Sequence, residues 1–563
     1  MFYTNIDRYG NNLLFRGYDK NGPVEKKIKF EPTFHIPDND GDWKSLDGQT
    51  LSEIQPGRKY DKNGKIVKRG TMRDCKEFLQ KYDDVSNFKV YGTTNYIHQF
   101  ISAFPGNIKY DRTQMNICTI DIEVGSEDGF PEPEQAKYEI ITITIKNNNG
   151  NIYHTWGTGD VDVDKCSQDV LYRKCKDERD LLLDFIEYWS NHIPDILTGW
   201  YSELFDVPYL INRIRRIFGE EMILNLSPWR KVEEHNARSE TVHNNHKYNI
   251  IGVTQLDYID LFKKFTYNTL GQPESYKLDH IANVVLGEKK LDYSEYGSLH
   301  LLYKHDYQKF VEYNIKDVEL VDKLEDKLGL INLVLTMAYR SKCTLNDTLG
   351  TVGIWDAILY NEFKKRKIAV PPRKNSDYDT IEGGYVKEPQ IGMHEWVVSF
   401  DLNSLYPHLI MQYNMSPETI VNSVIPGTTV DKLLDMSDID IPEDTCLTAT
   451  GQLFKNDVHG IIPQIIQEYY DERVVIKQKM IDAQQRYQKN KTESIDREIS
   501  LLYNNQMAIK IAMNSYYGAL ANKYFRYFDV RVAEAITVTG QLTIRWAEKA
   551  LNHYLNDLLK TDD

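Results

Sequence analysis

Residues 116–124 read Asn116-Ile117-Cys118-Thr119-Ile120-Asp121-Ile122-Glu123-Val124. Branched apolar residues occupy every second position from 120 onward, and this period of two is typical of a strand that buries one face. The opposite face of such a strand carries the carboxylates of Asp121 and Glu123 together. The stretch therefore predicts a strand that presents two acids from a buried sheet.

A helix with a second polar pair is predicted farther along the chain. Apolar residues recur at helical spacing from Phe310 to Leu328, and Gly329 supplies a stop signal. Tyr313 and Asp317 stand four positions apart, so they share one face of this helix. A tyrosine and a carboxylate are thus expected to point the same way.

A fourth acid lies between these two segments. Residues 196–200, Ile-Leu-Thr-Gly-Trp, predict a buried strand, and Asp206 stands where the next helix, Tyr209 to Phe218, begins. The four carboxylates are therefore expected to converge at one sheet edge; they are Asp121, Glu123, Asp206 and Asp317.

Such a cluster suits phosphodiester hydrolysis with two hard cations, which stabilise the attacking and leaving oxygens about 3.5 to 4 Å apart. Carboxylates favour magnesium or manganese, and two ions are expected per active site. A structural alternative exists for single residues. Asp206 can be a helix N-cap, worth about 1 kcal/mol, and Asp317 an exposed helix acid.

The three acidic segments, in this order, resemble the three exonuclease motifs of family B DNA polymerases. Residue by residue, the resemblance assigns metal ligation to all four acids, and Tyr313 matches the tyrosine that orients the attacking water. Segments between the motifs carry the same resemblance; they are Ser275 to His280 and Leu286-Gly287. The run from Asp128 to Pro133 makes the chain similar to the replicative polymerases of T-even-type bacteriophages.

A second centre is predicted after Val397 to Phe400, which reads as a strand that delivers Asp401 at its end. Leu405 to Tyr413 follow as a helix. The segment resembles polymerase motif A, and this implies that Asp401 binds two metals and that the Leu402 carbonyl binds one. Ser404 and Leu405 then belong to the nucleotide site, and Tyr406 excludes a ribose 2′-hydroxyl. Taken on its own, Tyr406 favours interpretation as a core aromatic; the functional interpretation depends on Ser404 to Pro407 together with Asp401.

A helical hairpin is predicted from about Ile461 to Asn522, with its turn at Gln488 to Glu493. Its second helix resembles polymerase motif B, and its first carries two cations four positions apart. The resemblance assigns nucleotide binding to five of its side chains; they are Arg473, Lys477, Lys510, Asn514 and Tyr517. Cations suit a triphosphate. The alternative is a solvated helix face with one core tyrosine.

Motif C, an Asp-Thr-Asp-Ser segment, does not occur in the sequence. The resemblance therefore implies that the polymerase site needs a second chain or a continuation that carries motif C. The chain is expected to be either one half of a polymerase encoded as two chains or a fragment that ends at Asp563. A thumb and a peptide for a sliding clamp are also expected in the remaining part.

The fold class is predicted as α/β and multidomain, with an RNase H-like exonuclease domain, a partial palm and helical fingers. Length agrees, because 563 residues suggest about three to five domains. The expected boundaries are residues 1–112 for an amino-terminal domain, 113–329 for the exonuclease, 330–372 for a return to the amino-terminal domain, 373–460 for the palm, 461–522 for the fingers and 523–563 for the palm again.

Composition limits the class of protein. The net charge of -15 argues against a basic nucleic-acid-binding surface, although local patches at Lys364 to Lys367 and Arg373-Lys374 could contact a phosphate backbone. Six cysteines without paired spacing predict reduced thiols. The histidines His235, His243 and His246 favour a polar hairpin over a zinc site.

No run of about 18 apolar residues and no signal-peptide pattern is present, so no membrane association and a cytoplasmic location are expected. The resemblance makes this the cytoplasm of an infected bacterial host. Its implied substrates are primer-template DNA, single-stranded DNA and deoxynucleoside triphosphates. Two alternatives remain from the sequence: a stand-alone 3′-to-5′ exonuclease, and a non-catalytic nucleic-acid-binding protein.

Overall fold

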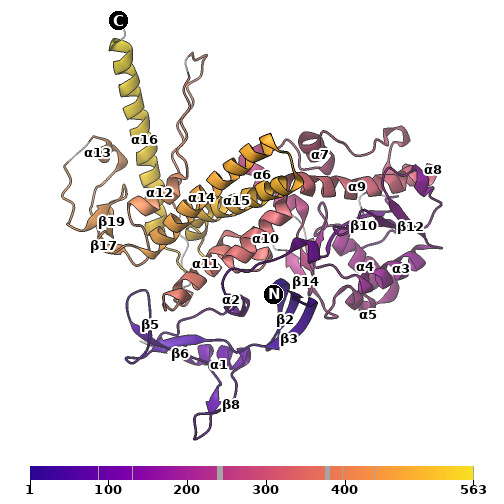
Figure 1. Ribbon diagram of the computed structural model, residues 1–563, viewed down its shortest axis with the longest axis horizontal. Helices are drawn as coiled ribbons and strands as arrows, with labels where there is room; N and C mark the ends of the chain where they lie inside the picture. Colours follow the sequence, from indigo (N-terminus) through magenta and orange to yellow (C-terminus); the bar gives the residue numbers. More distant parts are fainter. Residues whose placement is uncertain are drawn as a thin grey trace.

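The computed structural model describes residues 1–85, 88–127, 129, 131–237, 245–373, 381–395, 397–435 and 438–561. Figure 1 shows small sheets at the amino-terminal end, a larger sheet with its helices at the opposite side, and long helices between them. The predicted α/β multidomain class is confirmed. Some residues named above lie outside the described part; they are Asp128, Phe130, His243, Lys374 and Asp563.

The amino-terminal part forms three small antiparallel sheets. Their strands are β1 (Phe2–Tyr9), β2 (Asn12–Asp19), β3 (Gly22–Lys29), β4 (Phe34–Pro37), β5 (Trp43–Lys44), β6 (Thr50–Ile54), β7 (Lys59–Tyr60) and β8 (Ile66–Lys68). Two helices, α1 (Met72–Tyr82) and α2 (Tyr96–Ser102), complete this part. The N-cap Thr71 and Asp74 form a reciprocal capping box that fixes the start of α1.

A six-stranded sheet carries the predicted acidic strand near its centre, in the order β12-β11-β10-β9-β13-β16. Its strands are β9 (Ile117–Val124), β10 (Ile140–Asn147), β11 (Tyr153–Gly157), β12 (Val170–Lys174), β13 (Ile196–Thr198) and β16 (Thr254–Gln255). Strand β9 pairs antiparallel with β10 and parallel with β13, so hydrogen bonds hold it on both sides. The sequence predicts a meander of three strands at residues 116–124, 139–146 and 151–156, and β9, β10 and β11 match these bounds within about two residues at each end.

Helices pack around this sheet. They are α3 (Glu178–Asn191), α4 (Asp206–Phe218), α5 (Glu220–Ile223), α6 (Tyr258–Leu270), α7 (Leu278–Leu286), α8 (Leu299–His305) and α9 (Tyr307–Leu328). Helix α9 packs on β9 and β10, and Gly329 ends it in a left-handed conformation at φ 62°, as the sequence predicts. The hairpin of β14 (Val232–Ala237) and β15 (Asn245–Ile250) stands beside α4.

The predicted helical hairpin is present as α14 (Ile461–Lys489) and α15 (Glu493–Leu520), which lie side by side in Figure 1. Helices α10 (Leu330–Ser341) and α11 (Thr351–Lys365) pack against α15. The indole nitrogen of Trp355 donates to the Ala512 carbonyl oxygen at 2.9 Å. One apolar core runs from Phe2 to Ile536 through these elements, so the domain boundaries given above stay predictions.

The region after α11 holds α12 (Leu405–Gln412), α13 (Val430–Leu434), α16 (Val530–Thr561) and a sheet of β17 (Ile420–Val424), β19 (Gln452–Lys455) and β18 (Thr445–Leu447). Helix α16 leaves the body of the molecule toward the carboxyl end of the chain (Figure 1). No described helix is long and apolar enough to cross a membrane. None of the six cysteines is in a disulfide, and four are buried.

The strand predicted at Val397 to Phe400 is wrong. These residues form no regular structure, and their apolar side chains are exposed, with Val397 at 76% and Phe400 at 62%. Among the described residues no strand pairs with this segment. An apolar, branched sequence becomes a strand only where a neighbour supplies backbone hydrogen bonds and covers a face.

Candidate active sites

Asp121 and Glu123 lie on the half-buried face of β9, because Ile120, Ile122 and Val124 fill the opposite face. The carboxylates of Asp121, Glu123 and Asp317 have oxygens within 4.8 Å of one another. Asp317 reaches this point from α9. This is the one group of metal-ligating side chains found among the described residues.

Asp206 is at the first turn of α4 and does not cap it; the N-cap is Phe205, and no side chain caps this helix end. Its Oδ1 instead accepts a hydrogen bond from the Ile122 backbone N–H at 2.9 Å. The buried carboxylate of Asp206 is therefore tied to β9 between the two acids of that strand, although it is not one of the group of three.

Lys290 joins the acids and was not singled out by sequence reasoning. Its ammonium group donates to Asp317 Oδ2 at 2.5 Å and to the Tyr313 hydroxyl oxygen at 3.1 Å. The Lys290 backbone N–H donates to Asp279 Oδ1 at 2.8 Å, which fixes the loop after α7. Lys290 lies in an irregular loop, where no periodicity marks it.

Asn314 is a second residue that the sequence did not reveal. It is fully buried on α9, and its Nδ2 donates to Asp121 Oδ2 at 2.7 Å. Its Oδ1 accepts from the Thr144 hydroxyl on β10 at 2.5 Å. This chain of hydrogen bonds orients the Asp121 carboxylate. The one sequence signal for Asn314 is its position directly after Tyr313 on the predicted helix. The sequence does not show which residues of this helix contact the sheet.

Close packing of like charges shifts the acidities of the cluster. Burial and the neighbouring carboxylates raise the pKa of Asp121 well above its usual range. Burial and then Asp317 raise the pKa of Glu123 to about 8, and burial raises the pKa of Asp206 to about 7. Burial alone lowers the pKa of a lysine, but Asp317, Tyr313 and Asp121 raise that of Lys290 above its ordinary value.

The cluster fits divalent cations. Buried carboxylate oxygens need a hydrogen bond or a cation, and Asp317 Oδ1 is buried without a hydrogen-bond partner. An all-oxygen set of ligands suits magnesium or manganese more than zinc. Further cations at this point would also offset the repulsion that raises the pKa values of the acids.

The second predicted centre is open in comparison. Asp401 and Leu402 are exposed, and Ser404 begins α12 with a positive φ of 54°. Tyr406 packs against Tyr517 of α15, with ring centroids 4.9 Å apart, so the segments predicted as motifs A and B meet at these two tyrosines. Asp401 belongs to no group of metal ligands among the described residues.

The cations of the helical hairpin divide into two classes. Arg473 is buried, and its Nε donates to Gln506 Oε1 of α15 at 3.3 Å, so it does not lie on an exposed face. Lys477 and Asn514 are exposed, and Lys510 is half-buried. Of the five hairpin residues predicted to bind a nucleotide, four lie on faces that a ligand can reach; they are Lys477, Lys510, Asn514 and Tyr517.

Two family models match the chain: the exonuclease domain of DNA polymerase family B over residues 63–281, and DNA polymerase family B over residues 351–562. The DNA-directed DNA polymerase of Escherichia phage RB69 is 30% identical over 100% of this chain and 67% of its own length. The chain belongs to DNA polymerase family B. The DNA-directed DNA polymerase of Enterobacteria phage T4 is also 30% identical, over 68% of its length.

The DNA polymerase of Pyrococcus glycovorans is more distant, at 23% identity over 78% of this chain and 51% of its own length. The chain spans about two thirds of the length of its phage relatives. It is a DNA polymerase with an exonuclease domain, an enzyme class that acts on DNA and deoxynucleoside triphosphates and uses divalent metal ions in its exonuclease. The exonuclease match ends before Tyr313 and Asp317, which the fold brings to the same site.

Proposed function

We propose that the chain removes mismatched nucleotides from the 3′ end of DNA at the Asp121 cluster. The observation that carries this is the group of three carboxylates within 4.8 Å on β9 and α9. Asp121, Glu123, Asp206 and Asp317 would hold two magnesium or manganese ions, which would supply Lewis-acid stabilisation of the oxygen charges that develop in phosphodiester hydrolysis.

The neighbouring side chains position the reacting groups. The Tyr313 hydroxyl points toward Lys290 and orients the water that attacks the terminal phosphate. The Lys290 ammonium holds the Asp317 carboxylate in place and adds positive charge near the developing negative charge. Asn314 holds Asp121 Oδ2 by a hydrogen bond, which leaves Oδ1 of Asp121 available as a metal ligand.

The test is nucleotide release from a 3′-labelled single strand with magnesium. Asp121→Ala is expected to abolish release, while Asp164→Ala, an exposed acid of the same region, keeps it. Equal activity in Asp121→Ala would falsify the assignment. DNA binding without release in the unchanged chain would favour the non-catalytic alternative.

The proposed second activity is primer extension, for which Asp401 and the Leu402 carbonyl would hold metal ions together with an acid of motif C. Tyr406 lies against Tyr517 and limits the space at the sugar. The triphosphate contacts Lys477 and Lys510 of the hairpin, whereas Arg473, the third predicted cation, is buried against Gln506 and holds the two helices of the hairpin together. Ser404, Leu405 and Asn514 complete the nucleotide site. Both proposed reactions take place in the cytoplasm of an infected bacterial host.

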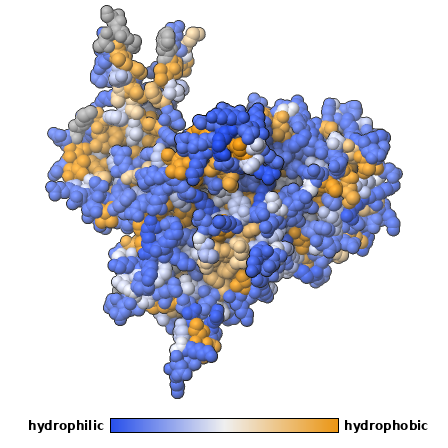
Figure 2. Space-filling model, viewed as in Figure 1, coloured by the Kyte–Doolittle hydropathy of each residue, from blue (hydrophilic) through white to orange (hydrophobic). Residues whose placement is uncertain are grey.

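Primer extension requires a polypeptide with motif C, as a continuation or as a second chain, and a sliding clamp is proposed to bind through that part. Support comes from the arm, residues 381–395 and 397–404, whose side chains Val386, Ile391 and Met393 are almost fully exposed. Figure 2 shows apolar residues along both upper projections of the molecule, and exposed apolar patches of this kind mark interfaces.

Two side-chain contacts join the arm to α16. Lys387 forms an ion pair with Glu548, and the Arg545 guanidinium lies 5.8 Å from the Tyr385 ring centroid. Mixing the chain with a motif C polypeptide of the same genome is expected to restore nucleotide incorporation. No incorporation in the stable complex of the two would support a stand-alone exonuclease.

A further inference from the structure

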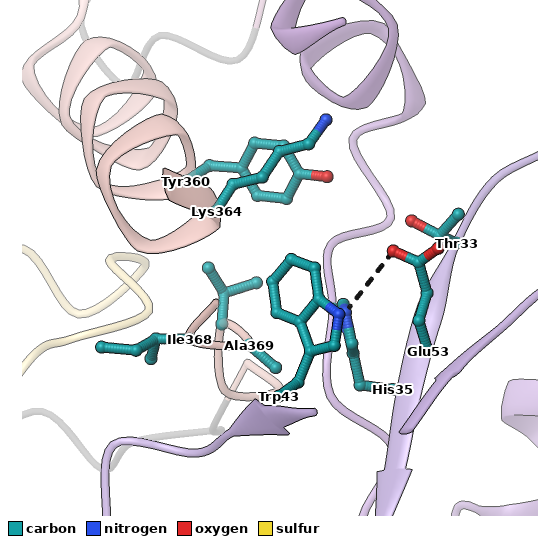
Figure 3. Close-up of a pocket in the computed structure, with 10 residues that line it drawn as sticks. Thr33, His35, Trp43, Glu53, Tyr360, Lys364, Ile368 and Ala369 are labelled. Carbon is teal, nitrogen blue, oxygen red and sulfur yellow. Dashed lines mark ion pairs between the residues drawn. The ribbon is translucent and has the colours of Figure 1, made fainter. Parts of the chain in front are cut away.

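A cavity of about 260 Å³ lies between the sheet β4-β6-β5 and α11, away from both acidic sites. Trp43 and His35 come from the sheet side, and Tyr360 and Lys364 project from α11 (Figure 3). Its floor is apolar; it consists of Ile368, Ala369 and Val370. The cavity is therefore walled by aromatic rings and carries a few polar groups, which is the usual composition of a small-molecule site.

His35 is the unusual member of this lining. Its side chain is 9% exposed, and neither ring nitrogen has a hydrogen-bond partner. Glu53 Oε2 lies 3.8 Å from its Nε2, which is too long for a hydrogen bond. Burial lowers the pKa of His35 to about 4, so the ring is neutral near pH 7 and the two groups form no ion pair there. The ring of His35 thus brings a buried donor and a buried acceptor to the wall of the cavity without a hydrogen bond to a neighbouring side chain.

The aromatic walls suit a flat ring. The His35 and Trp43 rings have centroids 4.2 Å apart, and Figure 3 shows the Tyr360 ring across the cavity from the Trp43 indole. Flat heterocycles gain from contact with such faces whatever their identity. A cavity of about 150 Å³ holds benzene, so one of this size has room for a ring system of two fused rings.

Lys364 supplies a charge at the same place. In the run from Lys364 to Lys367 the other three cations have carboxylate partners, Glu362 for two of them and Asp42 for Lys367. Lys364 instead donates to the uncharged Ser102 hydroxyl at 3.0 Å. Figure 3 shows its ammonium end directed away from Trp43, so this charge lies at the rim of the cavity, where it can meet an anionic group that extends from a bound ring.

We propose that this cavity binds a purine base that carries a phosphate, either a free purine nucleotide or an unpaired purine of a strand. The base lies between Trp43 and Tyr360, its edge exchanges hydrogen bonds with His35 and Glu53, and Lys364 contacts the phosphate. A purine edge offers donors and acceptors together, whereas an apolar side chain of a partner protein leaves His35, Glu53 and Lys364 unpaired.

The test is calorimetric titration of the full chain with AMP and GMP in EDTA, which prevents metal-dependent nucleotide binding at the two acidic sites. Trp43→Leu and His35→Leu are expected to weaken binding at least about tenfold. The control Trp546→Leu, an exposed tryptophan of α16, keeps the affinity of the unchanged chain. Circular dichroism melting verifies that each variant folds.

His35→Leu separates ligand binding from a role in the fold. A leucine removes the unpaired nitrogens from an apolar setting, so its melting temperature is expected to rise while binding is lost. Lys364→Gln is expected to weaken AMP but not adenosine, and Lys365→Gln to change neither. Tighter binding of AMP than of a short oligo-dA identifies a free nucleotide as the source, and the reverse identifies a strand. The proposal is overturned if neither purine nucleotide saturates the chain by about 10 mM, or if Trp43→Leu binds as well as the unchanged chain.

Discussion

Strand β9 and the segment Val397 to Phe400 differ in a way that explains the two sites. Both sequences place apolar residues before an acid: Ile120 precedes Asp121, and Val397, Val398 and Phe400 precede Asp401. Strand β9 is paired on both sides and covered by α9, and its acids are held among fixed partners. The later segment is unpaired and exposed. Local sequence of the same kind thus gives a preformed site only where the sheet around it is complete.

The largest effect is expected on activity when one acid in each of the two regions is substituted. Asp121→Asn is expected to lower exonuclease turnover by about a thousandfold, since several kcal/mol of charge stabilisation depend on the metal ligands. Asp401→Asn is expected to leave exonuclease turnover unchanged and to abolish incorporation in the presence of a motif C polypeptide. Single-turnover assays of both reactions measure this. A loss of both activities in either variant contradicts the separation of the two sites.

Removal of the Lys290 charge tests how far the site at β9 depends on its fixed partners. Lys290→Met is expected to slow the exonuclease by about 10- to 100-fold, because a fixed positive charge is lost from the site. Lys290 lowers the pKa values of Glu123 and Asp317, so its loss raises them further. The acid limb of the pH–rate profile should therefore move to higher pH. The profile of Lys289→Met, which alters the neighbouring lysine, is the control.

The pH dependence of stability in EDTA tests the same cluster without catalysis. The folded pKa of Glu123, about 8, is above the usual value for a glutamate, so the folded state binds more protons than the unfolded state. Stability is then highest below the unfolded pKa and falls as the pH rises toward 8. We expect the melting temperature to fall by a few degrees from about pH 5 to 8.

Magnesium is expected to restore the lost stability at pH 8, because it binds the folded cluster and not the unfolded chain. Asp121→Asn provides the contrast: its melting temperature in EDTA should depend less on pH and respond less to magnesium. A melting temperature of the unchanged chain that rises from pH 5 to 8 in EDTA would show that the acids are not forced together.

The smallest effect is expected in the exposed segment. Phe400→Ser should change the free energy of unfolding by less than about 0.5 kcal/mol, because the side chain is 62% exposed. Ile122→Ala, at the buried counterpart in β9, should cost about 2 to 5 kcal/mol. Chemical denaturation of both variants measures this. A large loss from Phe400→Ser would mean that the arm packs within the chain.

Local pattern was a reliable guide where each element carries its own signals. The alternation around Asp121, the stop at Gly329 and the polar turn of the α14–α15 hairpin all appear where the sequence predicts them. The acid order along the chain was sufficient to indicate the family, and the comparisons confirm it. These features depend on residues close in sequence, whose periodicity reports burial directly.

The tertiary structure decided everything that joins distant segments. It placed Lys290 on Asp317, Asn314 on Asp121 and Arg473 between two helices, although none of these contacts has a periodic signal. It also left Val397 to Phe400 without a partner strand. The sequence by itself determined the elements whose own periodicity and end signals are strong, and the chemistry that their side chains carry. Only the fold determined which side chains meet and are desolvated, because burial and strand pairing are set by neighbours hundreds of residues away.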